Sequence, residues 1–127
     1  MASPGIERII QISINVHDVP RAVRFYRDTL ELRLLFEAPP RMAFFDCGGV
    51  RLMLSLPERP EFDHPGSILY LKVPDIQAAH GTLKERGVVF EAEPHPVARL
   101  ETHELWLSEF RDTEGNLLAL MSEVPKG

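Results

Sequence analysis

Two adjacent residues, His103 and Glu104, are the combination in this sequence best suited to proton transfer. An imidazole changes its charge near neutral pH and a carboxylate accepts a proton, so the pair could act as acid and base on a bound molecule. Trp106, the single tryptophan, follows them. Its ring could stack on a planar ligand or pack in the core. The pair is therefore a candidate catalytic site, and Trp106 a candidate ligand contact.

The remaining residues with reactive side chains are typical of surface and loop positions. No two of the five histidines have the i, i+4 spacing that places a metal-binding pair on one helix face. The single cysteine, Cys47, precedes Gly48-Gly49 and lacks the sequence signature of a catalytic thiol. One cysteine cannot form a disulfide within the chain, which favours a reducing compartment, and we expect a cytoplasmic protein.

Composition indicates one soluble globular domain of 127 residues, with 44% hydrophobic and 26% charged residues. The net charge is −5 and there is no basic run, which argues against nucleic-acid binding. No apolar stretch has the length of a membrane span, so we expect no membrane association.

The first half of the chain predicts a strand, a helix and three further strands. Apolar and polar residues alternate over residues 8–17, which is the pattern of a half-buried strand. Asp18 then suits the N-cap of a helix that extends to Leu30. Three more strands are expected over residues 33–37, 41–46 and 50–56, and a connection rich in proline over 57–66.

The second half repeats this order. A strand is expected over residues 67–73, a helix from Asp75 to Gly87, and strands over 88–91, 104–112 and 117–122, with a loop over 92–102. Val16-His17-Asp18 matches Val73-Pro74-Asp75, and Phe44-Phe45-Asp46 with Gly49 matches Phe110-Arg111-Asp112 with Gly115. These repeats predict an α+β fold of two tandem βαβββ modules, residues 6–57 and 66–124.

Two motifs at opposite ends of this duplicated pattern resemble the vicinal oxygen chelate superfamily, which includes glyoxalases, bleomycin-resistance proteins and extradiol dioxygenases. Residues 11–32, QISINVHDVPRAVRFYRDTLEL, resemble the opening signature, with Glu31 in place of the usual glycine. Residues 110–120, FRDTEGNLLAL, resemble the closing Phe-x-Asp-Pro-x-Gly-Asn motif, with Thr113 in place of proline. The resemblance covers nearly the whole chain.

The resemblance implies that the curled mixed sheets of the two modules form a cup. In enzyme members the cup holds a divalent metal that chelates two neighbouring oxygens of the substrate. The family's ligand positions fall here on Gln11, Met53, Ile68 and Ala119. Only the glutamine suits a hard divalent ion, so we predict a largely apolar cup without metal or other cofactor.

The favoured prediction is a protein that binds, and sequesters, a hydrophobic or aromatic small molecule in this cup. An apolar floor with a few polar groups is typical of small-molecule pockets. The expected contacts are Gln11, Ser13, Met53, Ile68, Tyr70, Trp106 and Ala119.

The alternative that the sequence leaves open is a lyase, isomerase or oxygenase. Such an enzyme would depend on Ni, Zn, Mn or Fe, or would use His103 and Glu104. The resemblance also implies a homodimer.

Overall fold

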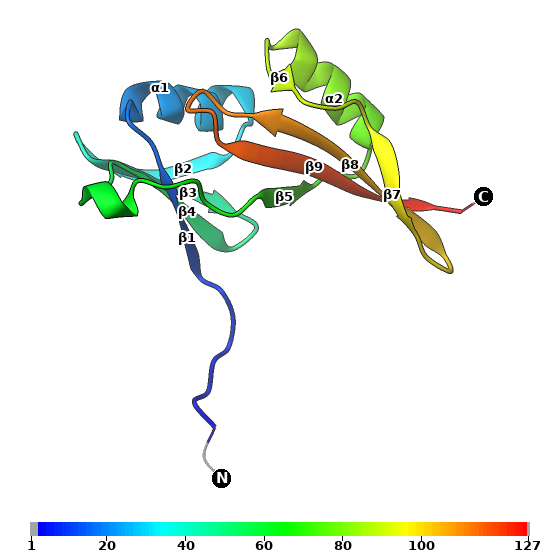
Figure 1. Cartoon of the computed structure of the whole chain (residues 1–127), viewed down its shortest axis with the longest axis horizontal. Coiled ribbons are helices and arrows are strands. Elements are labelled where there is room, and N and C mark those ends of the chain that lie inside the picture. Colours follow the sequence, from blue (N-terminus) through cyan, green and yellow to red (C-terminus); the bar gives the residue numbers. More distant parts are fainter. Residues whose placement is uncertain (1–2, 127) are drawn as a thin grey trace. The chain divides into compact units, whose positions relative to one another are not determined.

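Two sheets with the same strand order form the framework of the computed structural model, which describes residues 3–126 (Figure 1). The chain divides between His64 and Pro65 into two units, and each unit contains one sheet. The first sheet has the order β1-β4-β3-β2 and the second the order β5-β9-β8-β6. In both, the first and last strands of the unit are parallel and the other pairs are antiparallel. This confirms the predicted α+β fold.

The first unit follows the predicted order, with one helical region between its first two strands. Its strands are β1 (Gln11–Asn15), β2 (Arg33–Ala38), β3 (Met42–Cys47) and β4 (Val50–Ser55). The helix α1 (Val19–Arg24) continues into a π-helical turn, η1 (Phe25–Thr29), in which the Leu30 amide donates to the Phe25 carbonyl. A short 3-10 turn, η2 (Pro60–Phe62), lies in the connection that follows β4.

One face of the first sheet packs against this helical region and forms the core of the unit. Ile14, Leu54 and Phe45 are buried on three neighbouring strands, and Tyr26 is fully buried beside Phe45. Because side chains alternate along a strand, the residues between these apolar positions lie on the opposite face. The side chains on this opposite face are therefore the ones available to contact a ligand.

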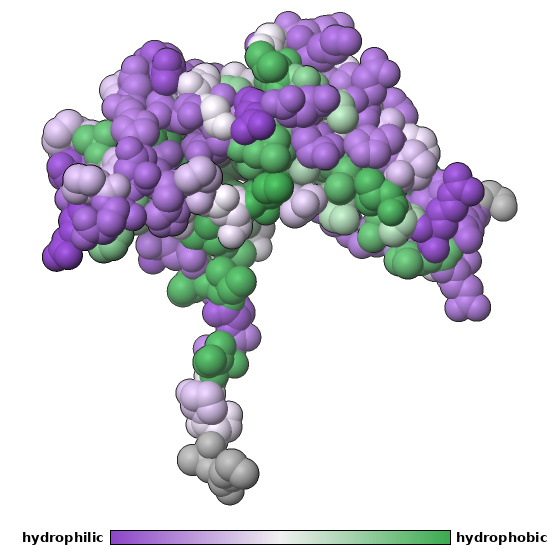
Figure 2. All heavy atoms as spheres, in the orientation of Figure 1, coloured by the Kyte–Doolittle hydropathy of each residue, from purple (hydrophilic) through white to green (hydrophobic). Residues whose placement is uncertain are grey.

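The strand predicted over residues 8–17 is shorter in the structure, because β1 begins at Gln11. Ile6, Ile9 and Ile10 precede it and are 87%, 67% and 58% exposed, so Ile10 does not contribute to the core as its alternation predicted. The segment before β1 carries hydrophobic residues between hydrophilic ones along its length (Figure 2).

The second unit contains one strand more than the sequence predicted. Its elements are β5 (Leu69–Lys72), α2 (Ile76–Glu85), β6 (Val89–Phe90), β7 (His95–Arg99), β8 (His103–Arg111) and β9 (Leu117–Pro125). The prediction of a loop over residues 92–102 was wrong, because β7 pairs with β8 inside this segment. β6 pairs with the end of β8 and β7 with its beginning, so the two short strands share one edge of β8.

The break between β6 and β7 is closed by hydrogen bonds from β8. The Ser108 hydroxyl donates to the Ala92 carbonyl at 2.7 Å, and the Glu91 amide donates to the Glu109 carbonyl at 2.8 Å. Ser108 is fully buried on the same face as Phe110, which lies in the core beneath α2 with Leu118. The prolines and charged residues of this segment are typical of loops, so the sequence pattern did not indicate the edge strand β7.

The motifs that carry the family resemblance act as structural caps and turns. Asp18 and Asp75 accept hydrogen bonds from the backbone amides of Arg21 and Ala78, and so cap α1 and α2. Asp112 is buried and accepts both the Glu114 and the Asn116 amides at 2.8 Å, which organises the turn before β9.

Glu31, which replaces the usual glycine of the family, has a φ of 60°. This left-handed backbone is the conformation that glycine adopts without strain.

The sheet register corrects one detail of the internal repeat. Phe110 is fully buried like Phe45, whereas Phe44 lies on the opposite face of its strand. Phe44 pairs with Met53, and its counterpart in the second sheet is Glu109, which pairs with Ala119. The predicted match of Phe44 with Phe110 is therefore displaced by one residue.

Candidate functional site

The face of the first sheet that points away from α1 combines aromatic, sulfur and polar side chains. The sheet register aligns Ser13, Met53, Phe44 and Phe36 in one row across all four strands. Gln11, Arg51 and Asp46 form the next row. We call this surface the first open face. It contains three predicted ligand contacts, namely Gln11, Ser13 and Met53.

Two phenylalanine rings form the apolar centre of the first open face. Phe36 on β2 stacks on Phe44 on β3 with ring centroids 4.3 Å apart and an interplanar angle of 24°. Phe36 remains 51% exposed, so its ring is available to a planar molecule. The guanidinium carbon of Arg51 lies 5.8 Å from the centre of the Phe44 ring, within the range of a cation–π contact. Sequence reasoning missed both phenylalanines and Arg51, although their alternation with buried residues in β3 and β4 indicated this face.

The side-chain amide of Gln11 is held by two neighbours on β4. Its Oε1 accepts a hydrogen bond of 2.7 Å from Arg51 Nε, and its Nε2 lies 3.8 Å from the sulfur of Met53. The oxygen that could ligate a metal therefore faces a permanently charged guanidinium. The amide oxygen of Gln11 thus has a positively charged neighbour, and the amide also lies beside a thioether, which together are unsuited to a hard divalent cation.

The equivalent positions of the second unit do not supply metal ligands either. Ile68 has a hydrocarbon side chain, and Ala119 is fully buried with no donor atom. Among residues 3–126 there is no group of three or more histidine, cysteine, aspartate or glutamate side chains that could hold a metal ion. The residues present do not fit the metal that the family implies.

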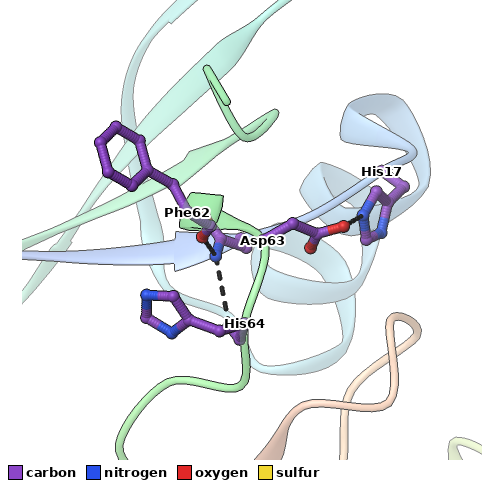
Figure 3. A network of polar contacts seen from close by, with 5 residues as sticks. His17, Phe62, Asp63 and His64 are labelled. Carbon is purple, nitrogen blue, oxygen red and sulfur yellow. Dashed lines mark hydrogen bonds and ion pairs between the residues drawn. The ribbon is translucent and has the colours of Figure 1, made fainter. Parts of the chain in front are cut away.

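Residues at and just after the end of β1 form hydrogen bonds with residues 62–64, at the end of η2 and directly after it. Asn15 donates through Nδ2 to the backbone carbonyls of Phe62 and His64, and His17 Nε2 lies 2.9 Å from Asp63 Oδ2. Figure 3 shows the His17 ring directed at the Asp63 carboxylate, next to Phe62 and His64. Since Asn15 belongs to the first open face, these bonds hold residues 62–64 at its edge.

The second sheet also has a face that points away from its helix, which we call the second open face. Tyr70, Ala119 and Glu109 form one row across β5, β9 and β8. Tyr70 is 51% exposed, whereas Ala119 is fully buried at the base of the row. Ile68 precedes β5 and is 39% exposed.

Glu109 and His95 are residues of this face that sequence reasoning did not select. Glu109 Oε1 is buried and has no hydrogen-bond partner in the described part of the chain, and His95 Nε2 on β7 lies 4.0 Å from it. Their placement depends on the pairing of β7 with β8, which the sequence did not predict.

The predicted acid and base, His103 and Glu104, are separated by the strand that carries them. Both lie in regular pairing with β9, so their side chains point to opposite faces. Both oxygens of Glu104 already have partners. Its Oε2 lies 3.0 Å from Arg99 Nε, and its Oε1 accepts a hydrogen bond of 3.2 Å from the Trp106 indole N–H. The structure therefore does not bring the two predicted side chains together on one face.

Trp106 lies on the face of β8 that carries Ser108 and Phe110, away from Tyr70 and Ala119. Its predicted stacking on a ligand beside Tyr70 is not supported by the register. The ring is half-buried, and its only nitrogen is used by Glu104.

A small cavity lies elsewhere in the second unit, between α2 and the segment around β6. Its volume is about 220 Å³, and three of its lining residues are charged, namely Lys84, Glu91 and Glu93. Sites for drug-sized ligands are usually larger, at roughly 300–1,000 Å³, and mostly apolar. The aromatic surface of the first open face is therefore the better candidate for a ligand site.

The sequence model of the Glyoxalase/Bleomycin resistance protein/Dioxygenase superfamily matches residues 8–120. The chain belongs to this superfamily. It is 26% identical over 126 residues to YraH of Bacillus subtilis strain 168, a match that covers 89% of this chain and 96% of YraH. No helix in the described part of the chain is long and apolar enough to cross a membrane.

Two solved structures similar to this chain are an antibiotic binding protein and a lyase. TnmS3, an antibiotic binding protein from Streptomyces sp. CB03234, is 26% identical with a TM-score of 0.74, covering 98% of this chain and all of TnmS3. Lactoylglutathione lyase from Agrobacterium tumefaciens also has a TM-score of 0.74, covering 92% of this chain and 94% of the lyase. At 18% identity, the lyase shows likeness of fold alone.

Proposed function

We propose that this protein binds an aromatic small molecule on the first open face and sequesters it without metal or other cofactor. The stacked pair of Phe36 and Phe44 is the observation that carries the proposal. The exposed ring of Phe36 offers a planar ligand an apolar surface without any rearrangement of the core. The family membership and the similarity to an antibiotic binding protein support the binding of a small molecule.

Arg51 adds a preference for ligands with an anionic or carbonyl group. Only its Nε is used by Gln11, and the guanidinium lies beside the Phe44 ring. An acceptor on the rim of an aromatic ligand would meet the remaining N–H groups. The proposed ligand is thus an aromatic acid or carbonyl compound.

The test uses 1-naphthoate as probe and the methyl resonances of Met42 and Met53 as reporters. We expect saturable shifts of both resonances, and at least about fivefold weaker binding for Phe36→Ala, which is about 1 kcal/mol. Leu100→Ala is the control, since Leu100 is 43% exposed but lies between β7 and β8 of the second unit. Equal affinity of the two variants, or no saturable shift in the wild-type protein, would contradict the proposal.

The enzymatic alternative finds less support. His103 and Glu104 point to opposite faces, and the family's metal positions lack suitable donors. No catalytic step is assigned to the first open face.

We further propose a cytoplasmic homodimer. The single cysteine and the family resemblance support this. Light scattering on the purified protein would test the dimer, since a mass near 14.4 kDa at all concentrations would contradict it.

A further inference from the structure

The second open face contains a carboxylate oxygen whose hydrogen-bonding needs are unmet. Glu109 Oε1 is removed from solvent and accepts no hydrogen bond from any of residues 3–126. His95 Nε2 lies 4.0 Å from this oxygen, beyond hydrogen-bond distance. Buried polar atoms are nearly always satisfied in folded proteins, so an unsatisfied one indicates a missing partner.

The hydrogen bond on the other side of the His95 ring determines what Nε2 presents to Glu109. His95 Nδ1 lies 2.7 Å from the backbone carbonyl of Glu93, and a carbonyl oxygen can only accept. Nδ1 therefore carries the hydrogen, and in the neutral ring Nε2 is a lone pair. In this neutral form, Nε2 of His95 and Oε1 of Glu109 are two acceptors 4.0 Å apart with no hydrogen between them.

Other charges on this face do not resolve the conflict. Arg111, which follows Glu109 on the same face, donates to Glu91 at 2.7 Å and to the Gly115 carbonyl at 3.0 Å. Lys72 is exposed on β5, in the row of Met121 and Leu107 rather than in that of Glu109. Neither cation is therefore placed to pair with Glu109, whose side chain is 32% exposed.

We propose that His95 and Glu109 form a receptor for the protonated amine of a small molecule. A nitrogen about 2.8 Å from both acceptors can bridge a gap of this width, and an ammonium group has two N–H bonds to spare for it. Its positive charge balances the carboxylate. Ala119, the shortest side chain of the row, lies between Glu109 and the hydroxyl-bearing Tyr70. This site is independent of the aromatic site proposed on the first unit.

The test compares two cations of equal charge, butylammonium and butyltrimethylammonium, in NMR titrations at pH 8. We expect butylammonium to shift the His95 ring nitrogens and the Glu109 carboxyl carbon in a saturable manner. Butyltrimethylammonium has no N–H group and should bind at least about tenfold more weakly. Equal binding of the two cations would overturn the proposal, because charge alone would then explain it.

Butylammonium binding to single-residue variants tests whether His95 and Glu109 bind the amine or only stabilise the fold. Glu109→Gln and His95→Gln should each weaken butylammonium binding by at least about tenfold, while Glu123→Gln, an exposed carboxylate on β9, leaves it unchanged.

Stability gives a second readout for the same variant. In Glu109→Gln the new amide can donate to His95 Nε2, so we expect its Tm at pH 8 to equal or exceed that of the wild type. A lower Tm would show that the two residues already stabilise each other as an ion pair and would overturn the proposal.

Discussion

Arg51 Nε donates a hydrogen bond of 2.7 Å to Gln11 Oε1, the one oxygen at a family ligand position in the first unit. To coordinate a metal ion, the Gln11 oxygen would have to give up the hydrogen bond from Arg51. The metal ion would then lie beside the positively charged guanidinium of Arg51. Coulomb repulsion between two positive charges a few ångströms apart opposes that exchange, and a single amide contributes too little affinity to overcome it. The residue that kept the family's ligand type is therefore used as a hydrogen-bond acceptor.

The first prediction concerns metal binding. Calorimetric titration of Ni²⁺ or Mn²⁺ into protein purified without chelators should show no stoichiometric binding, and Gln11→Ala should behave as the wild type does. Ser13→Ala, on the same strand and face, is the control for non-specific effects. One equivalent of tightly bound metal that is lost in Gln11→Ala but kept in Ser13→Ala would refute this prediction.

The second prediction concerns the anchoring of Trp106. Its indole N–H donates to Glu104 Oε1, so Glu104→Ala should shift the indole N–H resonance and expose the ring further to solvent. We expect a red shift of tryptophan emission and a loss of about 1 kcal/mol in the free energy of unfolding. Glu101→Ala, an exposed carboxylate in the preceding turn, is the comparison. An unchanged indole resonance in Glu104→Ala would show that the bond does not persist in solution.

The third prediction tests the closure of the break between β6 and β7. Ser108→Ala leaves the Ala92 carbonyl without its donor in a buried setting, which should lower the free energy of unfolding by about 1–3 kcal/mol in urea titrations. Ser13→Ala, an exposed serine, should change stability by less than about 0.5 kcal/mol. If both variants unfold at the same urea concentration, the serine contributes nothing to this edge.

The fourth prediction concerns the reactivity of Cys47. Burial raises the pKa of this thiol, and the neighbouring Asp46 carboxylate raises it further. A raised pKa means less thiolate at any given pH, so the pH–rate profile of alkylation by iodoacetamide should lie at higher pH than that of the urea-unfolded chain. Asp46→Asn keeps an oxygen for the Gly49 amide while removing the charge, and should move the profile part of the way back. A folded-state profile at lower pH would contradict the stated cause.

The sequence predicted the architecture well because strand alternation, the two aspartate caps and the glycine turns are local signals. It failed at β7, where pairing with β8 overrides a local composition of proline and charge. It also failed for the site, where the decisive relationships join residues on different strands. The contacts of Arg51 with Gln11, of Phe36 with Phe44 and of His95 with Glu109 depend on the sheet register, which single-sequence patterns do not fix.

The two units have the same strand order, yet equivalent positions now carry opposite chemistry, since Phe44 on one open face corresponds to Glu109 on the other. Equal strand order therefore does not give equal surfaces, because an aromatic ring on one open face stands where the other has a carboxylate. The repeated topology predicts where each side chain lies, while the group that each face can bind depends on the residues of that unit alone.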